Sequence, residues 1–176
     1  MKKTKFMTVL AGVLLGAVLL GACGETDVQK VEGKKASAEQ KEKKEKKKKD
    51  EVFKVGDTIN VNGLEITITS ATFKKPEQYS TAEKGNVLDL TVETKNSGDD
   101  KAFIDNTEFN LYDNDGNKLD SYYGYSEMAI SGDLNKGKKL SGHLFFDVPK
   151  NKSYEMIYQP SFSFDDKEIK YNIIPK

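Results

Sequence analysis

The chain has 176 residues, and its 28 lysines balance 28 acidic residues, so the formal net charge at pH 7 is zero. That balance is uneven along the chain, because residues 52–176 hold fifteen lysines against twenty acidic residues, a net charge of −5. A negatively charged segment without arginine is poorly suited to polyanions, which excludes nucleic acid as an expected partner. The single cysteine, Cys23, excludes an internal disulfide.

The first 22 residues have the pattern of a bacterial lipoprotein signal peptide. Three lysines precede an apolar stretch, residues 6–20, and the lipobox Leu20-Gly21-Ala22-Cys23 follows. We predict cleavage between Ala22 and Cys23 and attachment of lipid, including palmitate-type acyl chains, to the Cys23 thiol. Two or more acyl chains would anchor the protein to the outer face of the cell membrane of a Gram-positive-type bacterium.

An uncleaved transmembrane helix is the alternative for this segment. Residues 6–24 would span roughly 28 Å as a helix, which is borderline for a bilayer. Gly12, Gly16 and the position of the only cysteine favour the lipoprotein interpretation.

Residues 23–51 are predicted to form a lysine-rich, disordered tether. Val28 and Val31 are its only large hydrophobic residues, so it offers little to bury. Fully stretched, the tether would reach about 90 Å. It is interpreted as a solvated spacer, with binding to anionic lipid or envelope polyanions as the alternative.

Residues 52–176 have the alternating polarity of β-strands. Runs 58–61 and 64–69 flank Asn62-Gly63, which predicts a tight hairpin, and 86–95 is a second long strand with one apolar face. Further strands are expected at these positions: 107–112, 118–121, 140–148, 154–158 and 168–173. No helical pattern extends beyond one turn at 81–84.

Seven to nine short strands in about 120 residues predict an all-β, immunoglobulin-like antiparallel β-sandwich, with a small barrel as the alternative. Tryptophan is absent and no second cysteine exists, so aliphatic residues, phenylalanine and tyrosine must fill the core. The expected organisation is a signal peptide at 1–22, the tether at 23–51 and the sandwich domain at 52–176.

Several segments of this domain resemble one family. They are GDT at 56–58, VLDLTVETKN at 87–96, FNLYD at 109–113, GKKLSG at 137–142 and FDVP at 146–149. They are similar to Gram-positive lipoproteins that share a C-terminal immunoglobulin-like domain of unknown function, itself similar in fold to a small secreted mycobacterial antigen. These are strand and turn residues, so the resemblance implies a fold and no catalytic role.

Metal and catalytic motifs are weak. The acidic turn 113–117 lacks the further acids of an EF-hand and is interpreted as a hairpin turn. His143 is the only histidine and is expected to be exposed on the outer face of a strand. No nucleophile motif is present, so we expect no enzyme activity, no cofactor and no metal.

The most suggestive segment is the loop at 122–128. Its candidate binding residues are Tyr122, Tyr123, Tyr125 and Met128, residue types that often anchor interaction surfaces. Alternatively, the rings fold down and cover an open part of the sandwich.

The sequence therefore predicts a lipid-anchored, non-catalytic binding or interaction module for a protein or cell-envelope partner. The alternatives are a structural or envelope-stress surface protein without a discrete ligand, and a hydrolase with an unrecognised site.

Overall fold

The structure is a computed structural model that describes residues 28–31, 51–161 and 167–176. The predicted signal peptide, its cleavage site at Ala22 and the lipidation site Cys23 lie outside the described residues. Within the described residues, no helix is both long enough and apolar enough to cross a bilayer.

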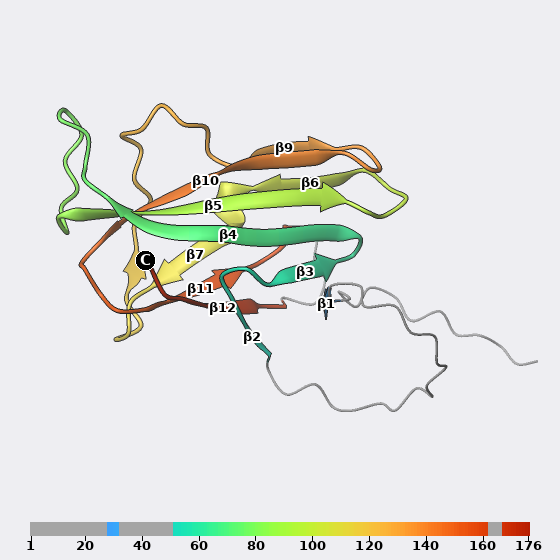
Figure 1. Ribbon diagram of the computed structural model, residues 1–176, viewed down its shortest axis with the longest axis horizontal. Coiled ribbons are helices and arrows are strands. Elements are labelled where there is room, and N and C mark those ends of the chain that lie inside the picture. Colours follow the sequence, from blue (N-terminus) through green and yellow to red (C-terminus); the bar gives the residue numbers. More distant parts are fainter. Residues whose placement is uncertain (1–27, 32–50, 162–166) are drawn as a thin grey trace, which may run out of the picture.

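Two five-stranded sheets face each other as a sandwich (Figure 1). The first sheet has the order β1 (Val28–Lys30), β3 (Thr58–Val61), β4 (Leu64–Lys74), β5 (Asn86–Asn96), β10 (Lys139–Val148). The second has the order β2 (Val52–Lys54), β12 (Ile169–Ile173), β11 (Tyr154–Tyr158), β7 (Phe109–Tyr112), β8 (Lys118–Leu119). A small third sheet pairs β6 (Ala102–Asp105) with β9 (Ser131–Leu134). The predicted β-sandwich is confirmed.

The core lies between the two large sheets and follows the alternation of the sequence. In β5, Leu88, Leu90 and Val92 are fully buried, and they belong to one cluster with Tyr154 and Tyr158 of β11. Aromatic and aliphatic side chains thus fill the centre that tryptophan and a disulfide occupy in antibody domains.

The predicted hairpin between β3 and β4 is confirmed. Asn62 and Gly63 have φ angles of 51° and 91°, the left-handed pair that a two-residue hairpin turn requires. The turn also contacts a second loop, because the Gly63 carbonyl accepts hydrogen bonds from the backbone N–H groups of Ser97 and Gly98.

Some short elements differ from the sequence-based expectations. Strands β6 and β9 lie in segments without strong alternation, and a 3-10 helix (Asn106–Glu108) precedes β7. The single helical turn expected at 81–84 is instead an irregular turn. Its backbone N–H groups at Glu83 and Lys84 donate to the Asp147 carboxylate at 2.6 and 3.0 Å, an attachment that no local pattern predicts.

Strand β1 requires a correction to the predicted tether. Residues 28–30 lie inside the segment expected to be disordered, yet they pair with β3 at the edge of the first sheet, with Val28 opposite Val61. Val28 is buried with 8% of its surface exposed. A single buried apolar residue is enough to form this strand, because the edge of β3 supplies both the backbone hydrogen-bond partners and the apolar contact.

Candidate functional site

A charge cluster built around the buried Asp89 lies on the outer face of the first sheet, opposite the core. The Asp89 carboxylate contacts His143 Nδ1 at 2.8 Å and Lys74 Nζ at 3.0 Å, and Lys74 Nζ also contacts Glu127 Oε1 at 3.1 Å. Only 4% of the Asp89 surface is exposed. Burial disfavours the charge of Lys74, but its hydrogen bonds to Asp89 and Glu127 prevail and raise its pKa.

This cluster changes the expected environment of two residues. Asp89 is on the outward face of β5, as the alternation predicts, but it is buried: its carboxylate contacts Lys74 and His143, and Lys74 in turn contacts Glu127 of the loop between β8 and β9. His143 was expected to be exposed and alone. Instead its side chain is only 27% exposed, bonds Asp89 and stacks on Phe145 with ring centroids 5.3 Å apart. Sequence alternation identifies the face of a strand, whereas contacts with residues distant in the sequence leave no local signal.

The candidate binding loop is attached to this outer face along the edge of β10. The Tyr122 N–H donates to the Phe145 carbonyl at 2.8 Å, and Ile130 N–H donates to the His143 carbonyl at 3.0 Å. Gly142 permits this approach, because a Cβ there would lie 2.7 Å from Ile130 backbone atoms. The loop therefore closes the β10 edge of the sheet.

Two of the predicted binding residues are used to hold the loop down. Tyr122 is buried, and its hydroxyl accepts from the Glu77 N–H at 2.8 Å and donates to the Ser80 carbonyl at 2.6 Å. The Tyr125 hydroxyl donates to the Lys75 carbonyl. The Tyr125 ring lies 5.3 Å from that of Tyr122 between centroids. These contacts join the 120–130 loop to the loop between β4 and β5.

The other two predicted binding residues point into solvent. Tyr123 is 82% exposed and Met128 is 81% exposed. A third exposed hydrophobic residue, Tyr79, was not predicted; it is 94% exposed and lies in the turn whose Glu77 and Ser80 backbone groups bond Tyr122. We call Tyr79, Tyr123 and Met128 the exposed triad.

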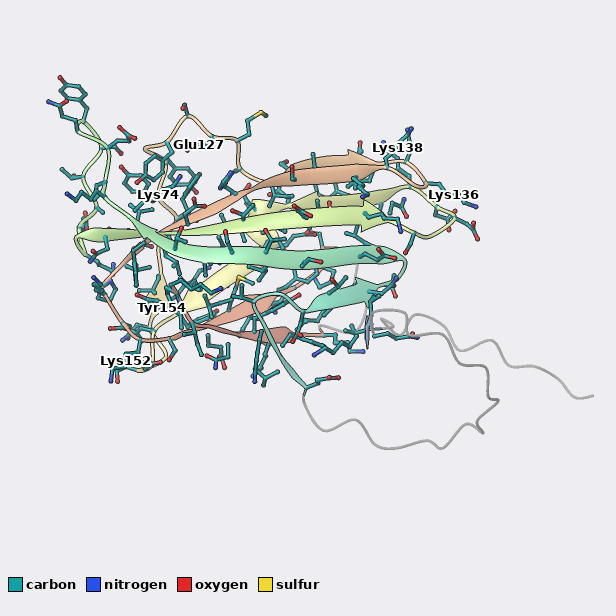
Figure 2. All side chains as sticks on the ribbon, viewed as in Figure 1. Lys74, Glu127, Lys136, Lys138, Lys152 and Tyr154 are labelled. Carbon is teal, nitrogen blue, oxygen red and sulfur yellow. The ribbon has the colours of Figure 1, made fainter. Side chains whose placement is uncertain are left out.

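Beneath the loop is a cavity of about 230 Å³. Its lining includes aromatic residues, the histidine and a glutamate: Tyr122, Tyr123, Tyr125, Phe145, His143 and Glu127. Lys74 Nζ lies 4.8 Å from the Tyr125 ring centroid and 5.3 Å from that of Phe145, so a cation of the protein itself covers these rings. Figure 2 shows Lys74 and Glu127 close together near this loop.

The acidic turn between β7 and β8 is a hairpin turn, as the sequence indicates. Asp113 Oδ1 accepts from the Asp115 and Asn117 N–H groups at 3.0 and 2.8 Å, and Gly116 has a φ of 83°. Hydrogen bonds from Asn117 lower the pKa of Asp113. Within the described ranges, no group of three or more His, Cys, Asp or Glu side chains is arranged to hold a metal.

Comparison with known proteins identifies the domain. Residues 53–169 match the family model described as a domain of unknown function, DUF4352. The chain is 34% identical over 141 residues to the uncharacterized lipoprotein YcdA of Bacillus subtilis (strain 168), covering 78% of this chain. The match spans only 36% of YcdA, about a third of its length.

Two solved structures of Bacillus subtilis proteins have the same fold. The crystal structure of the putative lipoprotein YcdA of Bacillus subtilis aligns with a TM-score of 0.55 at 29% identity, covering 64% of this chain and 37% of that chain. The Bacillus subtilis protein YjhA aligns with a TM-score of 0.53 at 18% identity, covering 71% of this chain and all of that chain. The secreted protein MPT63 of Mycobacterium tuberculosis aligns at 12% identity with a TM-score of 0.46, over 67% of this chain and 84% of that one.

The predicted resemblance to lipoproteins with an immunoglobulin-like domain of unknown function is thus confirmed. The family model covers more than half of the chain, and the YcdA match covers more than two thirds of it at over 30% identity. The chain belongs to the DUF4352 family and is homologous to a lipoprotein of Bacillus subtilis.

Proposed function

We propose that this protein is a lipoprotein anchored at the outer face of the cell membrane by acyl chains on Cys23, and that its sandwich is a non-catalytic interaction module. The lipobox before Cys23 and the homology to lipoprotein YcdA support the anchor. Two or more acyl chains suffice for stable membrane retention.

The exposed triad is the observation that carries the interaction role. Tyr79, Tyr123 and Met128 are more than 80% exposed, although the two loops that bear them are held together by the buried Tyr122 and the half-buried Tyr125. Because the backbone beneath these side chains is already ordered, binding through them does not require the loops to become ordered, which favours large anchors at interfaces. We assign the contact with a protein or cell-envelope partner to this surface.

The charge cluster supports a non-catalytic role. An Asp–His pair resembles a general base with its orienting carboxylate. Here Lys74 contacts the same carboxylate at 3.0 Å, so a fixed cation already neutralises the charge that would stabilise an imidazolium. The cluster is better suited to fixing the loop than to activating a hydroxyl group for hydrolysis.

The anchor is tested by Cys23→Ser. Because the variant has no thiol to acylate, we expect its partitioning into the detergent phase to fall to background, while its circular dichroism spectrum stays that of the wild type. Continued retention of the unprocessed chain would contradict the anchor and favour the transmembrane alternative.

The interaction role is tested with residues 24–176, with cell-wall sacculi and solubilised envelope extract as probes. Changing the exposed triad to serine should weaken saturable binding at least tenfold without lowering the melting temperature. The matched control changes Asp100, Lys136 and Lys138, three exposed residues of other loops, to serine and should bind normally. Absence of saturable binding by the wild type would favour a structural or envelope-stress role instead.

A further inference from the structure

Strand β1 attaches the N-terminal segment firmly to the sandwich. Besides the pairing of Val28 with Val61, the Val31 N–H donates to the Thr58 carbonyl at 2.8 Å. Lys30 Nζ forms an ion pair with Asp57 Oδ1 at 2.7 Å, and this hydrogen bond lowers the pKa of Asp57. The segment is therefore held by an apolar contact, a backbone ladder and an ion pair.

This attachment shortens the distance between the lipid anchor and the domain. Cys23 precedes Val28 by five residues, which can reach roughly 18 Å at most. A tether that was free as far as residue 51 would allow about 90 Å. With β1 in place, the reach of the sandwich from its anchor is about one fifth of that value.

The direction of β1 also determines which end of the sandwich lies near the anchor. β1 is antiparallel to β3, and Val28 lies opposite Val61, directly beside the Asn62–Gly63 turn. The chain thus enters the sheet at the end that carries this turn and the 97–101 loop bonded to it. In Figure 1, β1 and the β3–β4 turn are at the right, whereas the loop between β4 and β5 and the loop after β8 are toward the left. In Figure 2, Lys136 and Lys138 mark the right end and Lys74 and Glu127 the opposite part.

We propose that β1 acts as a clamp that holds the Asn62–Gly63 end of the sandwich against the lipid surface and directs the exposed triad away from it. The partner of this end is the outer leaflet of the membrane to which Cys23 is anchored. The inference rests on the lipidation of Cys23 in the proposed function. The docking of β1 is supported independently by its pairing with β3 and by the Lys30–Asp57 ion pair.

Energy transfer in vesicles tests this orientation. The lipidated full chain is reconstituted with an acceptor dye on the lipid headgroups, and a donor is attached at Asp100→Cys or at Tyr79→Cys. Both positions are exposed, and the eleven-residue strands β4 and β5 separate the two ends by roughly 35 Å. We expect several-fold greater transfer from position 100 than from position 79. Equal transfer from the two positions would overturn the proposal.

Matched variants of β1 test the clamp. Val28→Asp places a charge in a buried site, whereas Gln29→Asp places the same charge at an exposed one. Val31→Pro removes the N–H that bonds Thr58, whereas Val31→Ala keeps it. We expect Val28→Asp and Val31→Pro to reduce the difference in transfer between the two positions, and Gln29→Asp and Val31→Ala to preserve it. An undiminished difference in both disruptive variants would overturn the clamp.

Two further measurements distinguish failure of the anchor from failure of the clamp. Vesicle flotation of the full chain reports lipid anchoring, and loss of flotation overturns the proposed anchor and the orientation together. Hydrogen exchange at the Val31 amide reports docking of β1 with or without lipid. Slow exchange supports the clamp, and exchange at the rate of an unstructured peptide overturns it.

Discussion

Tyr122 and Tyr123 are neighbours in the chain with opposite environments. Tyr122 is 5% exposed, packs with Val87 and Phe145 and bonds two backbone groups of another loop. Tyr123 is 82% exposed. Gly124 fits this arrangement, because a Cβ there would lie 2.1 Å from the Tyr122 hydroxyl oxygen. The tyrosine-rich loop therefore fits both interpretations of its sequence. The Tyr122 ring packs against the sandwich, and the Tyr123 ring is exposed to solvent.

We expect Tyr122→Ser to destabilise the protein by ~3 kcal/mol or more, since it removes a buried ring and leaves the Ser80 carbonyl and Glu77 N–H without that partner. Tyr123→Ser is the matched control and should leave stability nearly unchanged. Urea unfolding followed by circular dichroism measures both. Equal effects of the two changes on stability would contradict the assignment of a buried, stabilising role to Tyr122 and an exposed position to Tyr123.

The hydroxyl of Tyr171 gives a second residue-scale prediction. This oxygen is buried and has no hydrogen-bond partner among the described residues, whereas the Tyr154 hydroxyl donates to the Pro149 carbonyl and accepts from the Asn151 N–H at 3.0 Å. Tyr171→Phe should therefore be neutral or stabilising by up to ~1 kcal/mol, and Tyr154→Phe destabilising by ~1 kcal/mol. Denaturant midpoints of the two variants show whether each change stabilises or destabilises the protein. Marked destabilisation by Tyr171→Phe would contradict the conclusion that the Tyr171 hydroxyl makes no hydrogen bond.

At the scale of elements, the β3–β4 turn packs closely against the 97–101 loop. Gly63 has a φ of 91°, and a Cβ there would lie 2.7 Å from the Gly98 Cα; Gly116 has a φ of 83° with open space around it. Gly116→Ala should cost ~1 kcal/mol from backbone strain alone. Gly63→Ala should cost more, because it adds a clash between two backbones. Thermal melts compare the variants, and equal losses would show that the contact with Gly98 is unimportant.

At this scale, the sequence predicts an element when the residues that determine it are neighbours in the chain. The Asn62–Gly63 hairpin and the apolar face of β5 follow from neighbouring residues, so both are predictable. Strand β1 depends on the edge that β3 offers, and β6 and β9 support each other over a long sequence separation. β1 and β9 each carry a single apolar side chain, and β6 lacks the alternation of polar and apolar residues, so none of the three indicates a strand by itself.

The candidate site follows the same rule. Tyr123 and Met128 were predictable as large residues in an irregular segment. The burial of Asp89 and its contacts with Lys74 and His143 were not, because these residues come from three different strands, β4, β5 and β10. Tyr79 was missed because only the attachment of its turn to Tyr122 gives it a defined position.

For the whole molecule, the buried tyrosines predict how stability depends on pH. Burial raises the pKa of Tyr125, Tyr154, Tyr158 and Tyr171. Above pH ~10 the unfolded chain loses these protons while the folded protein keeps them, so stability must fall as pH rises. Urea midpoints at pH 8, 10 and 11 should decrease in that order, with a smaller decrease for Tyr171→Phe. A midpoint that stays constant above pH 10 would contradict the raised pKa values of these tyrosines.

The parallel pairing of β2 with β12 connects the two ends of the domain. Phe53 pairs with Tyr171, and their rings lie 5.7 Å apart between centroids. A chain that emerges from its amino end must therefore leave β2 without its neighbour until β12 has been made. Folding of this domain is therefore complete only after β12 has been synthesised, and loss of β12 would leave β2, more than a hundred residues earlier in the chain, as an unpaired strand.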